Sequence, residues 1–429
     1  MTFEESLKPY LPESEIAALL DALEKERVHG FYLNTNRFDD AYAQSHFLGL
    51  IPHPIVPHAF LYDEAKLPLG KSMFFDCGGC YIIDPSSVLP PYLLSPQKGE
   101  RILDLCAAPG GKTSVLSFLL GKGGVILAND ASYKRAKELS GNVERLGLGN
   151  VMVTCSEDLV NDGGYEGLFD AILLDAPCSG SAMFRKSDLA KADWSLEKVH
   201  RCASIQEKLL DDAAKLLIAG GRIVYSTCSF SYEEDEAVLL RFLETHPTFK
   251  PILPFAHPSF YHHPDLKESI RLFPSRFEGE GQFMCLLVDT REKEASSYNP
   301  KSKGLGKFEA LVREYGLEGR YNFLFGKNPY SLSLPLPLTA SSILRPGVKL
   351  LDETYPYVPD FALARYLNKE KGTEITLEQA RKYLRGESFP LNEKEGVALL
   401  TYDGLSLGFA KIVNGIAKNH YPKGLRRRY

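Results

Sequence analysis

The 429-residue sequence contains no apolar run that approaches the roughly 20 residues of a membrane-spanning helix. Its first residues, MTFEESLKPYLPESEIAALLDALEKER, are acidic and amphipathic, unlike the basic start and apolar stretch of a secretory signal peptide. There is no low-complexity tract, and the 44% hydrophobic and 24% charged residues are typical of a globular protein. We therefore expect a cytoplasmic protein that does not associate with membranes.

The sequence also lacks the dense cysteine framework of a small secreted domain, because its 8 cysteines are spread over a long chain. Cys77 and Cys80 form a CGGC motif, but no second CxxC or HxxxH motif supplies the other ligands of a zinc site. A thioredoxin-like motif would need a strand-to-helix context, which is missing here. We interpret CGGC as a glycine turn between two small side chains and predict no metal site.

Acidic residues are absent after Asp403, although the net charge of the whole chain is −5. Lys411, Lys418, Lys423 and the run Arg426 to Arg428 accumulate in this last segment. A basic tail of this kind suits a phosphate backbone, and the alternative is a solvated, frayed terminus.

Between Glu100 and Val288, apolar segments typical of strands alternate with segments that have helical spacing. This alternation predicts an α/β fold, namely a doubly wound, mostly parallel sheet whose ligands bind at the carboxyl ends of the strands. The predicted strands are 101–106, 124–130, 151–155, 169–176, 222–227 and 282–290. The predicted helices are 110–120, 132–147, 205–219 and 233–246, and the turn 219–221 follows the third of them.

The length indicates two to three domains, and the composition changes twice along the chain. Residues 1–95 mix a helix with short proline-rich segments, and residues 96–290 hold the α/β pattern. A polar stretch, 291–304, is interpreted as a linker. Residues 305–429 form a mixed region with predicted strands at 396–402 and 407–413.

The stretch DLCAAPGGKT (Asp104 to Thr113) leaves the first predicted strand of this pattern and opens a helix. Its end resembles a phosphate-binding P-loop, but Cys106 stands where that motif needs a glycine, and Pro109 lacks an amide hydrogen. The dinucleotide pattern GxGxxG is also absent. An adenosine ligand without phosphates is therefore favoured, and its predicted binding loop is Cys106, Ala107, Ala108, Pro109, Gly110, Gly111 and Lys112.

Three further residues are candidates for contacts to such a ligand. Asp130 ends the second strand, where doubly wound folds hold a ribose, and Arg135 follows it in the next helix. Asp158 ends the third strand and could accept from the adenine amino group. A helix cap or a solvated loop residue is the alternative for each acid, and a surface i,i+4 pair is the alternative for Arg135.

Two cysteines follow the fourth and fifth strands in similar surroundings, as DAPCSG and STCSFSYEEDE. Asp175 precedes Cys178 by three residues, and Cys228 stands about fifty residues later. A buried cysteine is by itself usually a small hydrophobic residue. Two cysteines and an acid beside a cofactor loop instead indicate a thiolate nucleophile and its partners.

One reaction requires this set of groups. Carbon 5 of cytosine attacks a methyl sulfonium only after a thiolate has added to carbon 6, and an acid at ring nitrogen 3 stabilises the charge that develops. Afterwards the carbon 5 proton leaves and the thiol is expelled. The residues alone leave open which cysteine attacks and which assists release.

The motifs DLCAAPGGKT, DAPCSG and STCSFSYEEDE, in this order, resemble those of the Nol/Nop/Sun family of RNA 5-methylcytosine methyltransferases. NDASYKRAKELSGNVERLGLGN and RLFPSRFEGEGQF are similar to its RsmF-type bacterial branch, which modifies small-subunit (16S) ribosomal RNA. The resemblance implies S-adenosylmethionine as cofactor and a Rossmann-like methyltransferase domain at 96–290. It further implies RNA-binding units on both sides, a small α+β domain at 1–95 and a PUA-like region at 305–429.

The resemblance also implies residue roles. Cys228 would be the nucleophile, Cys178 would serve product release, and Asp175 would contact the base edge and the cofactor. The loop Cys106 to Lys112 would hold the cofactor together with Asp130 and Asp158. Because both faces of the base must be reached, we expect the cytosine to be flipped out of its helix.

Two positions depart from the family pattern. Ile83 replaces a glutamine, and Ser181 and Ala182 replace a Glu-Gly pair. Both changes leave the target position open. The alternatives are the same chemistry on transfer RNA or DNA, or a ribosome-assembly factor that binds RNA without catalysis. We expect a monomer that binds ribosomal RNA or the small subunit.

Overall fold

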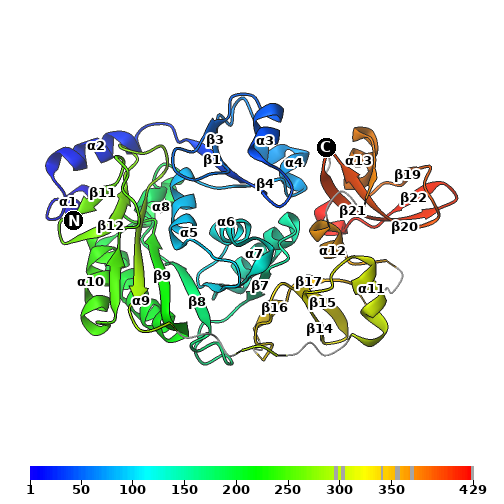
Figure 1. Ribbon diagram of the computed structural model, residues 1–429. Coiled ribbons are helices and arrows are strands. Elements are labelled where there is room, and N and C mark those ends of the chain that lie inside the picture. The colour runs from blue at the N-terminus through cyan, green and yellow to red at the C-terminus, as the bar shows by residue number, and fades with distance from the viewer. Residues whose placement is uncertain (294–297, 301–304, 340–341, 353–357, 368–371, 427–429) are drawn as a thin grey trace.

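The structure is a computed structural model that describes residues 1–293, 298–300, 305–339, 342–352, 358–367 and 372–426. Its centre is a 10-stranded sheet of order β11-β12-β13-β9-β8-β5-β6-β7-β16, in which β10 also pairs with β13 (Figure 1). The first five strands in sequence are β5 (Arg101–Asp104), β6 (Val125–Asn129), β7 (Val151–Thr154), β8 (Phe169–Asp175) and β9 (Leu217–Thr227). The other five are β10 (Phe249–Ile252), β11 (Tyr261–His263), β12 (Leu266–Leu272), β13 (Gln282–Asp289) and β16 (Ile343–Arg345).

The strand order reverses beside β5. The chain runs outward from β5 to β6 and β7, and then returns to form β8 and β9 on the other side of β5. All four pairings among these five strands are parallel. A reversal of this kind opens a crevice at the carboxyl ends of the two inner strands, where open α/β sheets bind ligands. The predicted doubly wound fold is confirmed.

Helices cover both faces of this sheet. Neighbouring strand residues point to opposite sides, so Ile102 packs with α5, α6 and α7, whereas Leu103 packs with α9 and α10. The resulting two apolar layers explain why the parallel strands are apolar throughout. The helices are α5 (Leu89–Leu94), α6 (Gly111–Leu120), α7 (Tyr133–Leu146), α8 (Asp188–Asp193), α9 (Leu196–Leu216) and α10 (Glu236–Thr245).

The predicted helix 205–219 and the turn after it differ from the structure. Helix α9 begins at Leu196, where Ser195 caps it by accepting from the amide of Lys198. Strand β9 begins at Leu217, so the predicted turn at 219–221 is wrong. Gly220 has φ +71°, and the pairing of β9 with β8 shifts register here. The glycine at positive φ thus forms a β-bulge within the strand instead of a turn.

The N-terminal segment packs against the central domain at two places. Helices α1 (Phe3–Leu7) and α2 (Glu13–Leu23) bury Leu7 and Leu19 in one apolar cluster with Phe230 and Phe273. The remaining segment forms an antiparallel sheet of order β2-β3-β1-β4 with two short helices. Its elements are β1 (His29–Leu33), α3 (Asp40–His46), β2 (Ile51–Pro52), β3 (Ala59–Tyr62), α4 (Met73–Asp76) and β4 (Cys80–Ile82).

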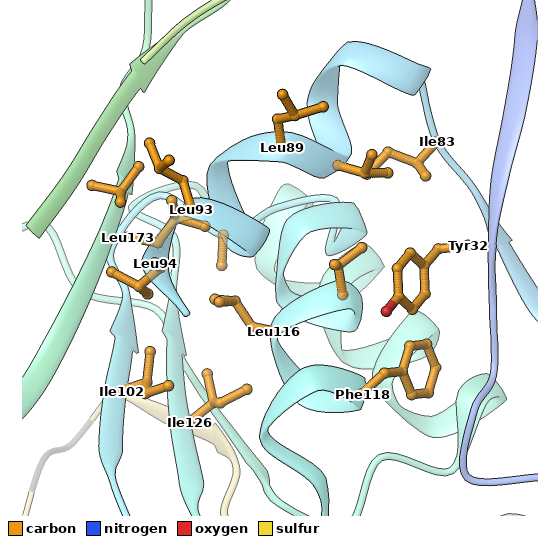
Figure 2. Close-up of a cluster of buried hydrophobic side chains, with 14 of the residues drawn as sticks. Tyr32, Ile83, Leu89, Leu93, Leu94, Ile102, Leu116, Phe118, Ile126 and Leu173 are labelled. Carbon is orange, nitrogen blue, oxygen red and sulfur yellow. The ribbon is translucent and has the colours of Figure 1, made fainter. Parts of the chain in front are cut away.

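Tyr32 on β1 connects this small sheet to the domain of the central sheet. Its ring stacks on Phe118 of α6, with centroids 5.9 Å apart and planes 4° from parallel (Figure 2). Leu116 on the same helix points toward Ile102 and Ile126 of the central sheet. Helix α6, which opens with the predicted cofactor loop, therefore lies between the two sheets.

The C-terminal region extends the central sheet and adds two others. Strand β16 pairs antiparallel with β7, so the region contributes the edge strand. Three strands form the order β14-β15-β17, and five form the order β18-β20-β21-β22-β19. The elements are α11 (Glu309–Glu314), β14 (Tyr321–Phe325), β15 (Asn328–Leu332), β17 (Val348–Lys349), α12 (Phe361–Tyr366), β18 (Thr373–Glu374), α13 (Leu377–Arg385), β19 (Phe389–Pro390), β20 (Gly396–Tyr402), β21 (Leu405–Val413) and β22 (Ile416–Asn419).

The two predicted C-terminal strands are confirmed as β20 and β21. In the basic tail, Lys411 and Lys418 are cross-strand partners on β21 and β22. Arg426 donates to the carbonyl of Tyr421, whereas Arg427 and Arg428 lie outside the described residues. So do 294–297 and 301–304 of the predicted linker.

The CGGC stretch (77–80) is a junction of all three parts of the chain. Its cysteines are buried, and Gly78 has φ +78°. Its carbonyls accept from Asn34 after β1, from Arg145 on α7 and from Arg365 on α12. No group of metal-ligating side chains gathers anywhere in the described ranges. None of the helices that the structure describes is long and apolar enough to cross a membrane.

Candidate active site

The loop that follows β5 is shaped by two glycines. Gly110 has φ +107°, and a Cβ there would lie 2.9 Å from a methyl carbon of Leu139. A Cβ on Gly111 would lie 3.1 Å from the Tyr81 ring. Both positions therefore favour glycine, because the loop turns tightly between α7 and the small N-terminal sheet.

Asp130 and Arg135 hold this loop from the next strand and helix. The Asp130 carboxylate is 3% exposed and accepts from the amides of Ala108, at 3.2 Å, and Ser132, at 3.0 Å. Arg135 donates to the Ala108 carbonyl at 2.5 Å, and its guanidinium lies 3.5 Å from Asp130. Asp130 and Arg135, which are five residues apart in the sequence, therefore meet at the loop.

Two cavities lie on either side of Asp175. The first, of about 800 Å³, is lined by Cys106, Asp130, Arg135, Cys178 and Cys228 among others, and we name it the cofactor cavity. The second, of about 530 Å³, is named the substrate cleft and runs between this loop and the small sheet. Both are lined by Cys106 and Asp175, so they meet there. The substrate cleft is also lined by Ala107, Ala108, Pro109, Gly111 and Lys112.

The cofactor cavity fits S-adenosylmethionine in the kind of groups that line it. The buried carboxylate of Asp130 lies at the end of the second strand, where a ribose is held. Ile205 on α9 is 43% exposed and lines the opposite wall as an apolar surface for a flat ring. Asp104 lines the substrate cleft rather than this cavity, and its buried Oδ1 has no hydrogen-bond partner among the described residues.

Of two neighbouring acids after β7, only Glu157 lines the cofactor cavity. Asp158, the predicted adenine contact, is exposed and accepts from the side chain of Asn161 at 2.8 Å. These hydrogen bonds lower the pKa of Asp158. The strand pattern placed an acid here but could not tell which of the two faces inward.

Asp175 is fixed by three donors from different elements. Lys112 on α6 donates to its Oδ2 at 2.8 Å. Ser226 on β9 and Gln282 on β13 donate to its Oδ1, at 2.8 Å and 3.2 Å. Lys112 lines the substrate cleft rather than the cofactor cavity, so its side chain serves Asp175 there. Ser226 and Gln282 were not among the residues predicted from the sequence.

The two predicted cysteines are brought together. Their sulfur atoms lie 3.1 Å apart, with Cys178 after β8 and Cys228 after β9. The hydrogen bond from Cys178 and the nearby ammonium of Lys112 lower the pKa of Cys228. The same hydrogen bond, burial and the charge of Glu234 raise the pKa of Cys178. The pair therefore favours a thiolate on Cys228 and a thiol on Cys178.

Glu234 ties the two cysteine loops together beneath the sulfur atoms. Its fully buried carboxylate accepts from the amide of Ser179, at 2.7 Å, and from the hydroxyl groups of Ser179 and Ser229. Gln206 on α9 donates to the same carboxylate at 3.2 Å. Each serine directly follows one of the cysteines, so this arrangement, named the Glu234 clamp, sets the distance between the sulfurs.

The positions that depart from the family pattern lie around the same loops. Ile83 lines the substrate cleft. The Ser181 hydroxyl accepts from the amide of Phe230 at 2.8 Å, and the amide of Ala182 donates to the Cys228 carbonyl at 3.0 Å. The Ser181–Ala182 pair thus anchors the loop that carries Cys228.

The chain is similar to known proteins over most of its length. The family described as 16S rRNA methyltransferase RsmB/F matches residues 91–288, and the methyltransferase RsmF PUA domain matches residues 370–427. The ribosomal RNA small subunit methyltransferase F of Enterobacter sp. (strain 638) is 32% identical over 391 residues, which are 85% of this chain and 81% of the relative. The protein of the same name from Escherichia coli (strain K12) is 31% identical over 396 residues, which are 85% and 82% of the two chains.

A solved structure shares the fold as well. The crystal structure of a methyltransferase homologue from Pyrococcus horikoshii has a TM-score of 0.56 and 30% sequence identity. The match covers 66% of this chain and 93% of that one.

Proposed function

Because the chain belongs to the RsmB/F family of 16S rRNA methyltransferases, we propose that Cys228, Cys178 and Asp175 transfer a methyl group to carbon 5 of a cytosine in that RNA. The chain is an S-adenosylmethionine-dependent cytosine-C5 methyltransferase of small-subunit ribosomal RNA. The observation that carries the residue assignment is the 3.1 Å contact between the two sulfurs, beside the point where both cavities meet.

The cofactor is held beside the loop Cys106 to Lys112, of which Cys106 lines the cofactor cavity together with Asp130 and Arg135. S-adenosylmethionine, when bound, supplies an electrophilic methyl group on a sulfonium. Asp130 accepts from the ribose hydroxyl groups, and Glu157 takes the adenine contact that the sequence assigned to Asp158. We base this choice on the lining of the cofactor cavity, which includes Glu157 and not Asp158.

The Cys228 thiolate adds to carbon 6 of the cytosine, and the electron density of the ring moves to carbon 5 and nitrogen 3. Nitrogen 3 takes up a proton from water as the charge develops, and the Asp175 carboxylate at the base edge accepts a hydrogen bond from this N–H, while Lys112 keeps the carboxylate oriented. Carbon 5 would then bond to the methyl group, whose bond to the sulfonium breaks and leaves its electron pair on the sulfur of the cofactor. Nitrogen 3 releases the proton when carbon 5 is methylated.

Release requires the carbon 5 proton to leave to water. Its bonding electrons restore the ring double bond, the bond between carbon 6 and sulfur breaks, and the electron pair returns to Cys228. The Cys178 thiol donates a hydrogen bond to the departing sulfur, as it does in the resting pair. Through this hydrogen bond, Cys178 assists the release of the product.

We further propose that residues 1–95 and 305–429 position the RNA around the methyltransferase domain at 96–290, and that one chain acts alone in the cytoplasm. Light scattering after gel filtration, with and without 16S rRNA, tests this assignment through the measured mass.

The residue roles are tested by purifying Cys178→Ala and Cys228→Ala from cells and probing denaturing gels for covalently attached RNA. We expect an adduct in Cys178→Ala only, and sequencing of the trapped RNA then identifies the target cytosine. The reverse pattern would exchange the two roles. An adduct in neither variant would overturn the covalent mechanism and favour a binding factor.

The substrate is tested with radiolabelled methyl transfer to three acceptors, namely 16S rRNA transcribed in vitro, small subunits and transfer RNA. We expect transfer to one of the first two and none to transfer RNA. Comparison of the transcript with the subunit decides whether the protein acts before or after assembly.

A further inference from the structure

Two cations line the substrate cleft without an acidic partner. Arg27 comes from the connection between α2 and β1, and Lys186 follows the loop that carries Cys178. Both side chains are exposed, and within the described ranges neither makes an ion pair or a side-chain hydrogen bond. They therefore lie where the cleft opens to solvent, one on the N-terminal unit and one on the methyltransferase domain.

The carboxylates of the same cleft are in the opposite situation. Four acidic side chains line it, and each already accepts from a donor of this chain. The donors are the Tyr62 hydroxyl for Glu64, the Ser86 amide for Asp84, the Thr113 hydroxyl for Asp104 and the Lys112 ammonium for Asp175. Three of these four donors are neutral and orient their carboxylates without cancelling the charge. Arg27 and Lys186 are the cations of the cleft that make no ion pair among the described residues.

The two charges act on a common neighbour. Burial lowers the pKa of His29, and the positive charges of Arg27 and of Lys186 lower it further. His29 lines the same cleft, between Arg27 and the end of β3. Arg27, Lys186 and this ring line one cleft, so a single ligand segment at its opening can contact all three.

We propose that Arg27 and Lys186 bind the backbone phosphates on either side of the target cytosine. This inference rests on the proposed function, because Asp175 at the inner end of the cleft is where the flipped base is held. A nucleotide whose base enters the cleft leaves its phosphates at the opening, where the cations lie. The two cations can bind these phosphates without breaking an ion pair, because neither makes one among the described residues.

Arg27 and Lys186 would therefore position an RNA strand irrespective of its sequence. Phosphate contacts fix register and carry no base information, so the pair holds the strand while the depth of the cleft selects the base. Because the cations stand on two different units, binding the strand also holds the N-terminal sheet against the methyltransferase domain.

The test is the salt dependence of binding to 16S rRNA transcribed in vitro. Fluorescence anisotropy gives the affinity at KCl concentrations between about 50 and 300 mM. Each phosphate contact contributes about 0.7–0.9 to the slope of log affinity against log salt. We expect Arg27→Ala and Lys186→Ala each to lower the slope by that amount and the double variant by twice as much. Arg27→Lys and Lys186→Arg should keep the slope of the unmodified protein.

The matched control is Lys267→Ala, which removes an exposed cation on β12 that lines neither cavity. Its slope should stay unchanged, and S-adenosylmethionine affinity should stay unchanged in all variants. Equal slopes in the unmodified protein, Arg27→Ala and Lys186→Ala would overturn the proposal. Because the readout is binding, it holds whether or not the unmodified protein transfers methyl groups to this RNA, and a failure of methyl transfer would count only against the proposed function.

Discussion

The sulfur atoms of Cys178 and Cys228 lie 3.1 Å apart, although 50 positions separate the two residues in the sequence. The contact follows from the fold, because β8 and β9 are parallel neighbours and their carboxyl ends meet at one edge of the sheet. The register pairs Asp175 with Ser226, so the acid and its donor also meet at this edge. The three residues that we propose for catalysis thus belong to two adjacent strand ends.

The first prediction concerns the Glu234 clamp. Glu234→Ala removes the acceptor shared by Ser179 and Ser229, so the two cysteine loops lose their common anchor. We expect the single-turnover rate of methyl transfer to fall on the order of 10²-fold, as for a displacement of about 1 Å at a reacting group. The KM for RNA and the affinity for S-adenosylmethionine should change little, because neither ligand contacts this carboxylate.

Glu234→Gln is the conservative comparison, since its carbonyl oxygen can still accept from the Ser179 amide. It should recover a large part of the rate that Glu234→Ala loses. Ser229→Ala, which deletes one arm of the clamp only, should lie between the two. If Glu234→Ala raised the KM values and left the single-turnover rate intact, the positioning role would be refuted.

The second prediction concerns Lys112, which sequence reasoning assigned to the cofactor and the structure places against Asp175. Lys112→Met removes the donor that orients Asp175 and should slow methyl transfer on the order of 10²-fold. It also removes a positive charge that lowers the pKa of Cys228, in addition to the larger effect of the Cys178 hydrogen bond. The pKa of Cys228 should therefore rise.

The pH profile separates these two effects. When the pKa of the nucleophile rises, the acidic limb of the profile of kcat/KM moves to higher pH. Lys112→Arg keeps the charge and should keep the position of that limb. An acidic limb that stays in place in Lys112→Met would show that Lys112 does not act on the thiolate.

The third prediction compares two neighbouring acids, of which one lines the cofactor cavity. Glu157 lines the cavity, whereas Asp158 is exposed and bonded to Asn161. Loss of one hydrogen bond to a charged group costs about 1.5–3 kcal/mol, which corresponds to roughly 10- to 150-fold in affinity. Glu157→Ala should weaken binding of S-adenosylmethionine by this factor, measured by calorimetry, and Asp158→Ala should leave it unchanged. The opposite result would restore Asp158 as the adenine contact.

Sequence reasoning could single out the proposed catalytic residues because each lies in a short string at the end of an apolar strand. Asp175, Cys178 and Cys228 follow directly from this pattern, and the parallel sheet then brings them together. Gln282 could not be found in this way. It lies 107 positions from Asp175 on an antiparallel strand, and only the pairing of β13 with β9 carries it to the site.

The errors in the predicted elements have a related cause. Gly220 and its neighbours have the composition of a turn, but pairing with β8 on one side and β13 on the other keeps them in strand β9. Tertiary pairing overrides local preference most easily in the interior of a sheet. The choice between Glu157 and Asp158 likewise depends on which side of a loop faces the cavity. The spacing of apolar residues in the sequence does not predict the orientation of a loop side chain.

The last prediction concerns the pH dependence of stability through Asp104. Its carboxyl group is fully buried at the end of β5, and Thr113 donates to one oxygen at 2.6 Å. Burial raises the pKa of Asp104 to about 7. The unfolded value is about 3.9, so the folded protein keeps a proton that the unfolded chain releases between about pH 4 and pH 7. The stabilising effect of this neutral carboxyl is therefore complete below about pH 4 and is lost as the pH rises to about 7.

Asp104→Asn keeps the shape of the side chain and cannot ionise. Relative to the unmodified protein, its stability should improve as the pH rises, by up to about 1.4 kcal/mol per pH unit until about pH 7, and then stay constant. Thermal unfolding without added S-adenosylmethionine at pH values from 5 to 8 measures this difference. Asp63→Asn is the control, because a hydrogen bond from Lys66 lowers the pKa of Asp63, which stays charged over that range in both states. If the difference in stability between Asp104→Asn and the unmodified protein were the same at every pH, Asp104 would be ionised throughout this range. The prediction of a buried, protonated Asp104 would then be wrong.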